Sequence, residues 1–382
     1  MLNIKKKIKN FFFSCGLLST SILLALFLGE GLVRIISPQQ LIVLNDGIWT
    51  SDTVLSWKHV PNSNEEVNLG EKKVRFISDN NGNRISAPPI KNVVCNTSIL
   101  FVGDSFLEAL QVENENTFVE LVRKSWELNN KASLCTVNTG VGGWGPNQYY
   151  LVAKQELIRR KYSLGIVFLY TGNDFVSTFD TLLSPRLPSK IHDFCIPSSL
   201  TFSDFKECIF YPVNDLLETK SHLFILLKNS SKSLLIKVGL SAEYFPPYFE
   251  KSNAASNIWK TTSDICASID ALFDSHETPV LFVLLPTPYQ VHQEIFQDYV
   301  QSFGIDKTKI DLEQPNKLLS DLLKGKKITL LDPLEFMRYN ASKGGNLYGK
   351  IDNHFNENGH NFIAQYLQPF IENVLLNENS HQ

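Results

Sequence analysis

The sequence lacks a strong excess of charge of either sign, since 36 lysine and arginine residues stand against 39 aspartate and glutamate residues, for a net charge of −3. No field of the whole chain therefore attracts nucleic acid, and no local basic patch follows the N-terminal lysines. Cys-x-x-Cys pairs and closely paired histidines, which are typical of metal sites, are also missing. These absences argue against a nucleic-acid-binding or metal-binding protein.

Internal repeats and low-complexity segments are missing as well, so neither a repeat architecture nor a disordered chain is indicated. The composition is that of ordinary globular proteins, with 43% hydrophobic, 20% charged and 11% aromatic residues. A chain of 382 residues can form one large domain with insertions or two smaller ones.

One long hydrophobic run is present, at the N-terminus. A lysine cluster within residues 1–10 precedes residues 11–29, which carry no charge. A helix of about 20 apolar residues spans a bilayer core, and a basic flank stays in the cytoplasm. We therefore predict a cytoplasmic tail at 1–10 and a single transmembrane anchor at 11–29. Everything after the anchor would lie outside the cytoplasmic membrane, which is the periplasm in a bacterium with an inner and an outer membrane.

Two alternatives to an uncleaved anchor stay open. A cleaved signal peptide usually has a shorter apolar core and an Ala-x-Ala site, whereas here Gly29-Glu30-Gly31 follows the run. A buried globular helix is the other alternative, but this run lies at the extreme end of the chain, directly after the lysines.

The six cysteines are compatible with an oxidising compartment, because five of them follow the predicted anchor. Cys195 and Cys208 lie in one loop-like region, and Cys95 and Cys135 both lie near the start of predicted strands. Cys266 would then be left over, inside a helix. The sequence does not determine this connectivity.

Strands and helices alternate after residue 95. Residues 30–94 read as an N-terminal extension of small strands packed on the main domain. Beyond them, strand-like runs fall at 98–103, 134–138, 164–170, 279–286 and 328–332. Helix-like runs fall at 114–129, 146–161, 256–275, 288–302, 313–324 and 356–374. This alternation predicts a five-stranded parallel sheet with helices on both faces.

Residues 176–255 interrupt the alternation with several prolines and one helix-like run at 219–237. A structureless loop of this length is improbable, so we predict an inserted subdomain. Insertions after strands often shape a site, and this one is a candidate lid; packing of the scaffold is its alternative role.

Ser105 is the most informative residue of the chain, because Gly103-Asp104-Ser105 ends a predicted buried strand. It is therefore expected at the carboxyl edge of the sheet, where open α/β folds build their sites. A serine hydroxyl needs a base to become a nucleophile, and donors for the oxyanion it creates. A helix cap or turn is its alternative role.

Four further residues supply the other parts of such a site. His354 is the candidate base, and Asp352, two residues earlier, the candidate partner that orients its imidazole. Gly143 and Asn173 are the candidate oxyanion donors, through a backbone N–H and a side-chain amide. Their alternative roles are structural: a buried histidine, a helix cap at Asp352 and turn formers at Gly143 and Asn173.

Three other polar residues receive structural interpretations. Asp104 and Asp174 are expected to bond backbone N–H groups around the site. His292 follows the strand at 279–286 and is expected on a helix surface.

Together, the segments 103–105, 138–143 and 172–174 and the pair Asp352 and His354 resemble the sequence blocks of the SGNH/GDSL hydrolase superfamily. The resemblance covers about residues 95–177 and 279–375. It implies a hydrolase-like domain at 95–375 with a flavodoxin-like three-layer α/β/α sandwich, an esterase, lipase or acyl-transfer activity, and no cofactor. The family commonly has Asp-x-x-His, whereas Ile351 stands at that position here. The shorter Asp-x-His spacing resembles membrane-anchored and polysaccharide-modifying branches.

Topology and resemblance together favour a membrane-anchored serine esterase that acts on O-acetyl or other small acyl esters of a carbohydrate or envelope polymer. The reaction would pass through an acyl-Ser105 intermediate. An O-acyltransferase with the same triad, a lipid esterase and a non-catalytic module of an envelope complex are the alternatives.

Overall fold

The structure is a computed structural model that describes residues 2–43, 47–86, 95, 97–175, 195, 201, 205–237 and 245–378. The chain divides into two compact units. The helical unit comprises Met1–Val43 and Ile191–Leu235, and the α/β unit comprises Leu44–Lys190 and Ile236–Gln382. The predicted domain at 95–375 and its insertion at 176–255 stay predictions. Within the insertion, residues 176–194, 196–200, 202–204 and 238–244 lie outside the described residues.

The α/β unit is built on a five-stranded parallel sheet, as predicted. Its strands are β5 (Thr97–Val102), β6 (Leu134–Asn138), β7 (Leu164–Tyr170), β8 (Val280–Leu285) and β9 (Leu330–Leu331). They are arranged in the order β6-β5-β7-β8-β9. This is the flavodoxin-like order, in which the chain changes direction across the sheet between its first and third strands, here β5 and β7. A crevice outside the strand ends is expected at that point.

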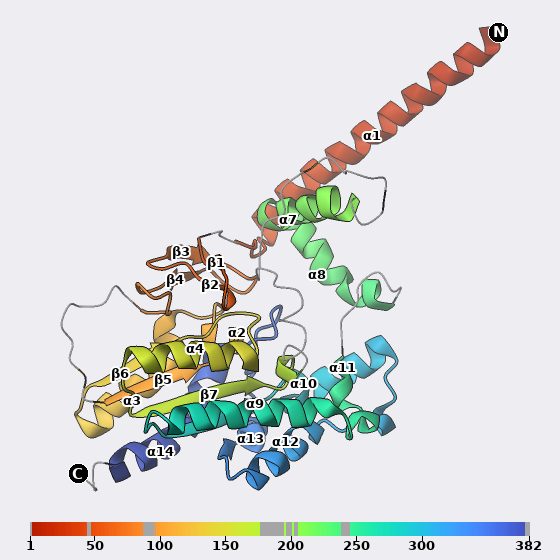
Figure 1. The fold of residues 1–382 in the computed structure, drawn as a ribbon. Helices are drawn as coiled ribbons and strands as arrows, with labels where there is room; N and C mark the ends of the chain where they lie inside the picture. Colours follow the sequence, from red (N-terminus) through yellow and green to blue (C-terminus); the bar gives the residue numbers. More distant parts are fainter. Residues whose placement is uncertain are drawn as a thin grey trace. The chain divides into compact units, whose positions relative to one another are not determined.

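The strands form from apolar runs that are buried on both faces. Ile99, Leu100, Phe101 and Val102 of β5 are all fully buried. Such continuous burial requires a cover on each side of the sheet. One hydrophobic core contains residues of α4 (Pro146–Arg159), α9 (Asn257–Asp274) and α12 (Gln314–Gly325). The other contains residues of α3 (Phe118–Asn130), α13 (Leu334–Ser342) and α14 (Glu357–Glu378), so the unit has three layers (Figure 1).

Three features of the helices differ from expectation. Helix α13 was not predicted. The run expected at 288–302 is two helices, α10 (Pro288–Val291) and α11 (Gln293–Phe303), separated by His292. The interpretation of His292 as a surface residue is wrong, because only 7% of it is exposed. Short helices complete the unit: α2 (Ser105–Glu108), η1 (Asn114–Asn116), η3 (Pro247–Phe249), η4 (Lys251–Asn253) and η5 (Lys307–Lys309).

Two antiparallel hairpins precede the sheet. The first pairs β1 (Trp49–Asp52) with β2 (Ser56–His59), and the second pairs β3 (Asn64–Val67) with β4 (Val74–Ile77). A backbone bridge between Arg84 and Asn138 joins the segment after β4 to the end of β6. The hairpins therefore pack on the edge of the sheet that carries the strand ends.

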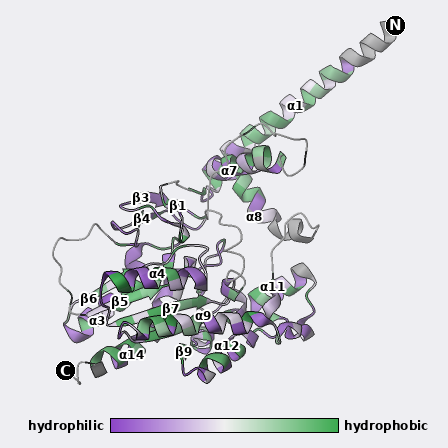
Figure 2. Cartoon of the chain, viewed as in Figure 1, coloured by the Kyte–Doolittle hydropathy of each residue, from purple (hydrophilic) through white to green (hydrophobic). Residues whose placement is uncertain are grey.

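The helical unit contains α1 (Leu2–Ile36), η2 (Lys206–Phe210), α7 (Tyr211–Lys220) and α8 (His222–Lys237). An 18-residue stretch within Asn10–Ile36 of α1 has a mean hydropathy of 2.2, so this part of the helix is long and apolar enough to cross a membrane, a test that a signal sequence also passes. Figure 2 shows hydrophobic residues along much of α1. The expected helix at 219–237 corresponds to α8, whereas α7 was not predicted.

The cysteines pair as the sequence suggested. Disulfides join Cys95 to Cys135 in the α/β unit and Cys195 to Cys208 in the helical unit. Cys266 is a free, buried cysteine of α9, as expected.

Candidate active site

Ser105 is the first residue of α2, immediately beyond the end of β5. Asp104 caps this helix, because its carboxylate accepts a hydrogen bond from the backbone N–H of Phe106 at 3.0 Å. A Cβ on Gly103 would lie 3.2 Å from two neighbouring side chains, so the turn has little room for a larger residue. Strand end, cap and helix start thus bring the Ser105 hydroxyl to the carboxyl edge of the sheet.

His354 lies beside Ser105 although 249 positions separate them. Its Nε2 is 2.6 Å from the hydroxyl oxygen of Ser105, and its Nδ1 contacts a carboxylate oxygen of Asp352. Because a carboxylate only accepts hydrogen bonds, Nδ1 carries the proton and Nε2 is left to accept the hydrogen of Ser105. The structure therefore brings these three predicted residues together in the order that proton transfer requires.

Besides His354, two other residues form hydrogen bonds with Asp352. The Gln111 side chain donates to its second carboxylate oxygen at 2.8 Å. Its own backbone N–H donates to the carboxylate of Glu71 at 3.0 Å. Helix α14 begins only at Glu357, so Asp352 does not cap that helix, and the alternative structural role is wrong.

The charges of Asp352 and His354 support each other. Burial by itself raises the pKa of the Asp352 carboxyl, but the His354 imidazole and hydrogen bonds from His354 and Gln111 hold that pKa below its ordinary value. Burial by itself lowers the pKa of His354, but attraction to Asp352 raises it above its ordinary value. Each partner therefore stabilises the charged form of the other. An imidazolium formed when His354 takes a proton from Ser105 would be stabilised in this way.

Asp104 and Asp174 bond backbone groups at the strand ends, as expected. The carboxylate of Asp174 accepts from the N–H of Tyr170 and the hydroxyl of Tyr149, both at 2.9 Å. Burial raises the pKa of Asp104 to about 6. Burial, and then the charge of Asp104, raise the pKa of Asp174 well above its ordinary value.

The two candidate oxyanion donors follow the strands on either side of Ser105. Gly143 follows β6 and Asn173 follows β7, and β5 lies between these strands. Gly143 has a φ of +77°, in the left-handed region that favours glycine. The side-chain oxygen of Asn173 is buried and has no hydrogen-bond partner within the described ranges. Their roles as donors stay predictions.

Side chains of the hairpins also reach this region, and none of them was predicted. Trp57 of β2 donates from its indole to the carbonyl of Gly142 at 2.9 Å. Nε2 of His59 lies 2.7 Å from a carboxylate oxygen of Glu108, and the same oxygen accepts from the indole of Trp49 at 2.8 Å. Glu108 belongs to the helix that Ser105 begins, so the extension is bound to the segment carrying the nucleophile. Along β2, the buried Trp57 and His59 alternate with half-buried residues. Because alternate residues of a strand share one face, this pattern is the local signal in the sequence that the two side chains point inward.

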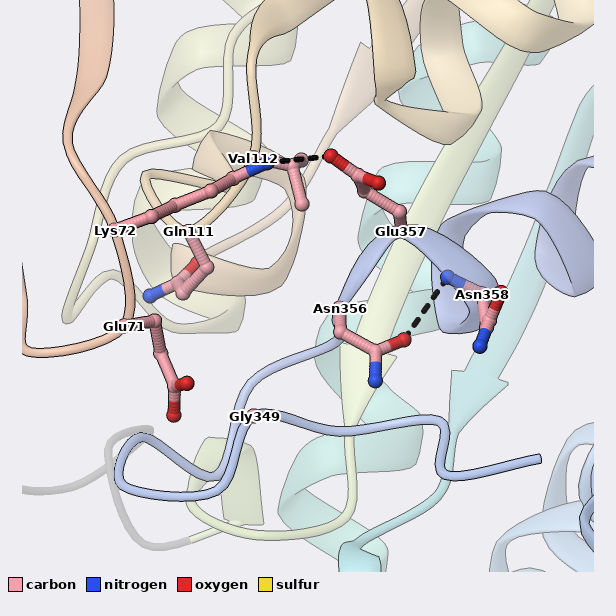
Figure 3. Close-up of a pocket in the computed structure, with 8 residues that line it drawn as sticks. All are labelled: Glu71, Lys72, Gln111, Val112, Gly349, Asn356, Glu357 and Asn358. Carbon is pink, nitrogen blue, oxygen red and sulfur yellow. Dashed lines mark hydrogen bonds and ion pairs between the residues drawn. The ribbon is translucent and has the colours of Figure 1, made fainter. Parts of the chain in front are cut away.

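A pocket of about 310 Å³, lined mainly by residues with polar side chains, adjoins Asp352 (Figure 3). Gln111 and Glu71 line it and also bond Asp352. The side-chain oxygen of Gln111 is buried and lacks a hydrogen-bond partner in the described part of the chain. An ion pair between Lys72 and Glu357, dashed in Figure 3, spans one side of the pocket. The complete lining is Glu71, Lys72, Gln111, Val112, Gly349, Asn356, Glu357 and Asn358.

No family model and no curated protein match this chain. Among solved structures, it is similar to the acetyl xylan esterase AlAXEase, with a TM-score of 0.40 and 12% identity over 72% of this chain and 99% of that one. It is also similar to a member of the lipolytic protein G-D-S-L family from Veillonella parvula, with a TM-score of 0.37 and 13% identity over 72% of this chain and 97% of that one. For a two-domain esterase active on acetylated mannans, the TM-score is 0.40 and the identity 10%, over 73% of this chain and 50% of that one. At such low scores and identities, these similarities carry no argument about substrate or catalytic residues.

Proposed function

We propose that this protein is a membrane-anchored serine esterase that removes small acyl groups, above all O-acetyl groups, from a carbohydrate or cell-envelope polymer. The observation that carries this proposal is the 2.6 Å contact between Ser105 and Nε2 of His354, with Asp352 on the other imidazole nitrogen. Nucleophile, base and orienting carboxylate in this arrangement are the requirements of acyl transfer to a serine.

The first half of the reaction acylates Ser105. Its oxygen attacks the ester carbonyl carbon while Nε2 of His354 takes the hydroxyl proton. Backbone N–H groups of Gly143 and Ser105 and the amide of Asn173 would bind the oxyanion. The tetrahedral intermediate then collapses, the carbon–oxygen bond to the alcohol breaks, and His354 returns the proton to the leaving alcohol. An acyl-Ser105 ester remains.

The second half releases the acyl group. Water attacks the acyl carbon while His354 takes a proton from it, and the bond to Ser105 breaks as that proton returns to the serine oxygen. The products are a free carboxylic acid and the original enzyme. If a sugar hydroxyl replaces water, the same steps transfer the acyl group, and the protein is an O-acyltransferase.

The pocket beside Asp352 supports a hydroxyl-rich substrate. Six of its eight lining residues carry a carboxylate, amide or ammonium group, and Val112 is the sole large apolar residue among them. A site for the acyl chain of a lipid needs a predominantly apolar lining. Sugar hydroxyls, in contrast, can donate to Gln111 and to the carboxylates. This favours a carbohydrate over a lipid ester.

The apolar run of α1 and the lysines before it support the proposed location. The helix would cross the cytoplasmic membrane once, with its N-terminus in the cytoplasm and the α/β unit outside. The substrate would then be a component of the envelope rather than of the cytoplasm.

Labelling with a fluorophosphonate probe tests the activity. We expect wild-type protein to be labelled, Ser105→Ala to be unlabelled and His354→Ala to be labelled much more slowly. His276→Ala, which changes a half-buried histidine of the same unit outside the site, is the matched control and should label normally. An unlabelled wild-type protein with intact disulfides would overturn the proposal in favour of a non-catalytic module.

Hydrolysis of p-nitrophenyl acetate, with and without a sugar acceptor, separates the two reactions. Turnover without an acceptor indicates an esterase. Probe labelling together with turnover only when the sugar is present indicates an acyltransferase.

A further inference from the structure

The exposed face of α7 is apolar up to Lys220 at its end, the reverse of the arrangement usual for a helix on a water-facing surface. Phe210, at its N-terminal boundary, Val213 and Leu216 are 54%, 38% and 50% exposed. Because they are spaced by three positions, they form one stripe along the helix. The buried residues of the helix are Pro212 and the charged Glu218. Helix α7 therefore presents hydrophobic side chains outward while it shields a carboxylate.

Hydrogen bonds tie α7 and α8 to the end of the apolar helix α1. The carboxylate of Glu30 accepts from the hydroxyl of Ser221 at 2.7 Å and from the N–H groups of His222 and Leu223 at 3.0 and 2.9 Å. It thus satisfies two of the free backbone donors at the start of α8. Arg34 donates to the carbonyl of Lys220, the last residue of α7, at 2.7 Å.

The position of these ties along α1 corresponds to the surface of a bilayer. About 20 helical residues span a bilayer core. Counted from Asn10, where the span that could cross a membrane begins, the core ends near Gly29. Glu30 and Arg34 then follow within about 8 Å along the helix axis, at the depth of the lipid headgroups. The junction of α7 and α8 is held at that same level.

The surroundings of the stripe also fit an interface. Leu32, Ile35 and Ile36, at the end of α1, are exposed hydrophobic residues of the same unit. Between positions 205 and 237, five lysines stand against three acidic residues. Lysine side chains near a membrane can place their stems in the apolar layer and their charges among the headgroups. A weakly basic segment with an outward apolar stripe is typical of helices that lie in this layer.

We propose that α7 lies in the outer interface of the membrane, with Phe210, Val213 and Leu216 embedded beside the point where α1 leaves the bilayer. This proposal rests on the membrane location that is part of the proposed function, but it does not depend on the chemistry of Ser105. The occupant of the stripe is lipid, because hydrogen bonds hold the stripe next to a helix that is itself apolar enough to cross a bilayer.

Photocrosslinking of the full-length protein in phosphatidylcholine and phosphatidylglycerol vesicles tests this surface. A benzophenone amino acid would replace Phe210 or Leu216 in separate variants. Leu128 of α3 and Ile158 of α4 are matched control positions, because both are hydrophobic and 80% and 70% exposed. We expect phospholipid adducts, identified by mass, at positions 210 and 216 and at most traces at 128 and 158.

Every other outcome overturns the proposal. Crosslinked dimers would show that a second copy covers the stripe, and crosslinks to another protein would show a protein partner. Equal adducts at all four positions, or none, would show that the stripe does not lie in lipid. Fluorophosphonate labelling of the same samples reports the esterase separately, so lipid adducts without probe labelling would remove the proposed activity and leave the membrane surface standing.

Quenching by brominated lipids is an independent measurement, since the natural tryptophans all belong to the α/β unit. Phe210→Trp should add fluorescence that brominated lipid quenches strongly. Added fluorescence from Leu128→Trp should be quenched much less. Equal quenching in the two variants would contradict the proposal.

Discussion

The side-chain amide of Gln111 donates to Asp352 at 2.8 Å, so the carboxylate that faces His354 is also held through its other oxygen. This bond is charge-assisted, and such bonds contribute about 1.5–3 kcal/mol. Gln111 is a positioning residue in the proposed esterase, because it acts on the reacting groups only through Asp352. It also lines the pocket next to the triad.

Replacing Gln111 should lower kcat more than it changes KM for a small ester. Gln111→Leu keeps most of the side-chain volume but removes the bond, and we expect kcat to fall roughly tenfold. The pH midpoint of activity, which follows the pKa of His354, should move to higher pH as well. Without the Gln111 bond that lowers the pKa of Asp352, the more basic carboxylate attracts the imidazolium more strongly. Steady-state kinetics with p-nitrophenyl acetate across the pH range measures both effects. An unchanged pH midpoint with a lower Tm would reduce Gln111 to a purely structural role.

Activity should rise with pH through the pKa of His354, because only the neutral imidazole can take the proton of Ser105. Attraction to Asp352 raises that pKa, so the midpoint of kcat/KM should lie above the ordinary histidine value of 6.5. Asp352→Asn removes the attraction, so the midpoint should move to lower pH while kcat falls about 10³- to 10⁴-fold. The rate of fluorophosphonate labelling against pH provides a second readout. A midpoint that does not move in Asp352→Asn would contradict the assignment of these two residues as a pair.

Stability should depend on the buried carboxyl of Asp104. Burial raises its pKa from 3.8 to about 6, so the folded state holds this proton over a pH range in which the unfolded chain has lost it. The contribution of Asp104 to stability therefore falls as pH rises from about 4 to about 6 and stays low above that range.

Asp104→Asn removes this titration and keeps an oxygen that can accept from Phe106. It should raise Tm relative to wild type at pH 8 and give little or no advantage at pH 4. Thermal unfolding at the two pH values measures the difference. The same change in Tm at both values would show that the raised pKa of Asp104 does not influence folding.

Gly143→Ala should impair catalysis, because φ is +77° there and the new methyl group would lie 3.2 Å from the ring of Trp57. Displacing the Gly143 N–H from the oxyanion should lower kcat about 10- to 100-fold. Gly344→Ala is the matched control, since Gly344 also has a positive φ, of +95°, but has no atom within 4 Å of the added Cβ. Both variants should lose about 1 kcal/mol of stability from backbone strain. Equal activity in the two variants would remove Gly143 from the oxyanion site.

The sheet was predictable because its strands are continuous apolar runs, and runs of this kind are buried wherever helices cover both faces. The predicted strand at 164–170 coincides with β7. Helix α13 was missed, although Leu334 and Met337 are buried on one side of it, because it is short and follows directly on the two-residue strand β9. His292 was misjudged because burial of a single polar side chain depends on neighbours, and one of these, Leu347, is distant in the sequence.

The amino-acid sequence by itself determined the apolar helix, the parallel sheet and the position of Ser105 directly after a strand, because these follow from local hydrophobicity and turn chemistry. Only the tertiary structure decided that His354 meets Ser105 across 249 positions and that Gln111 holds Asp352. It also decided that the hairpin residues Trp57 and His59 reach the nucleophile's helix and the adjoining turn, and that α7 turns its hydrophobic stripe outward. Contacts of this kind depend on how separate elements pack, and a short stretch of sequence does not indicate which distant residues will contact it.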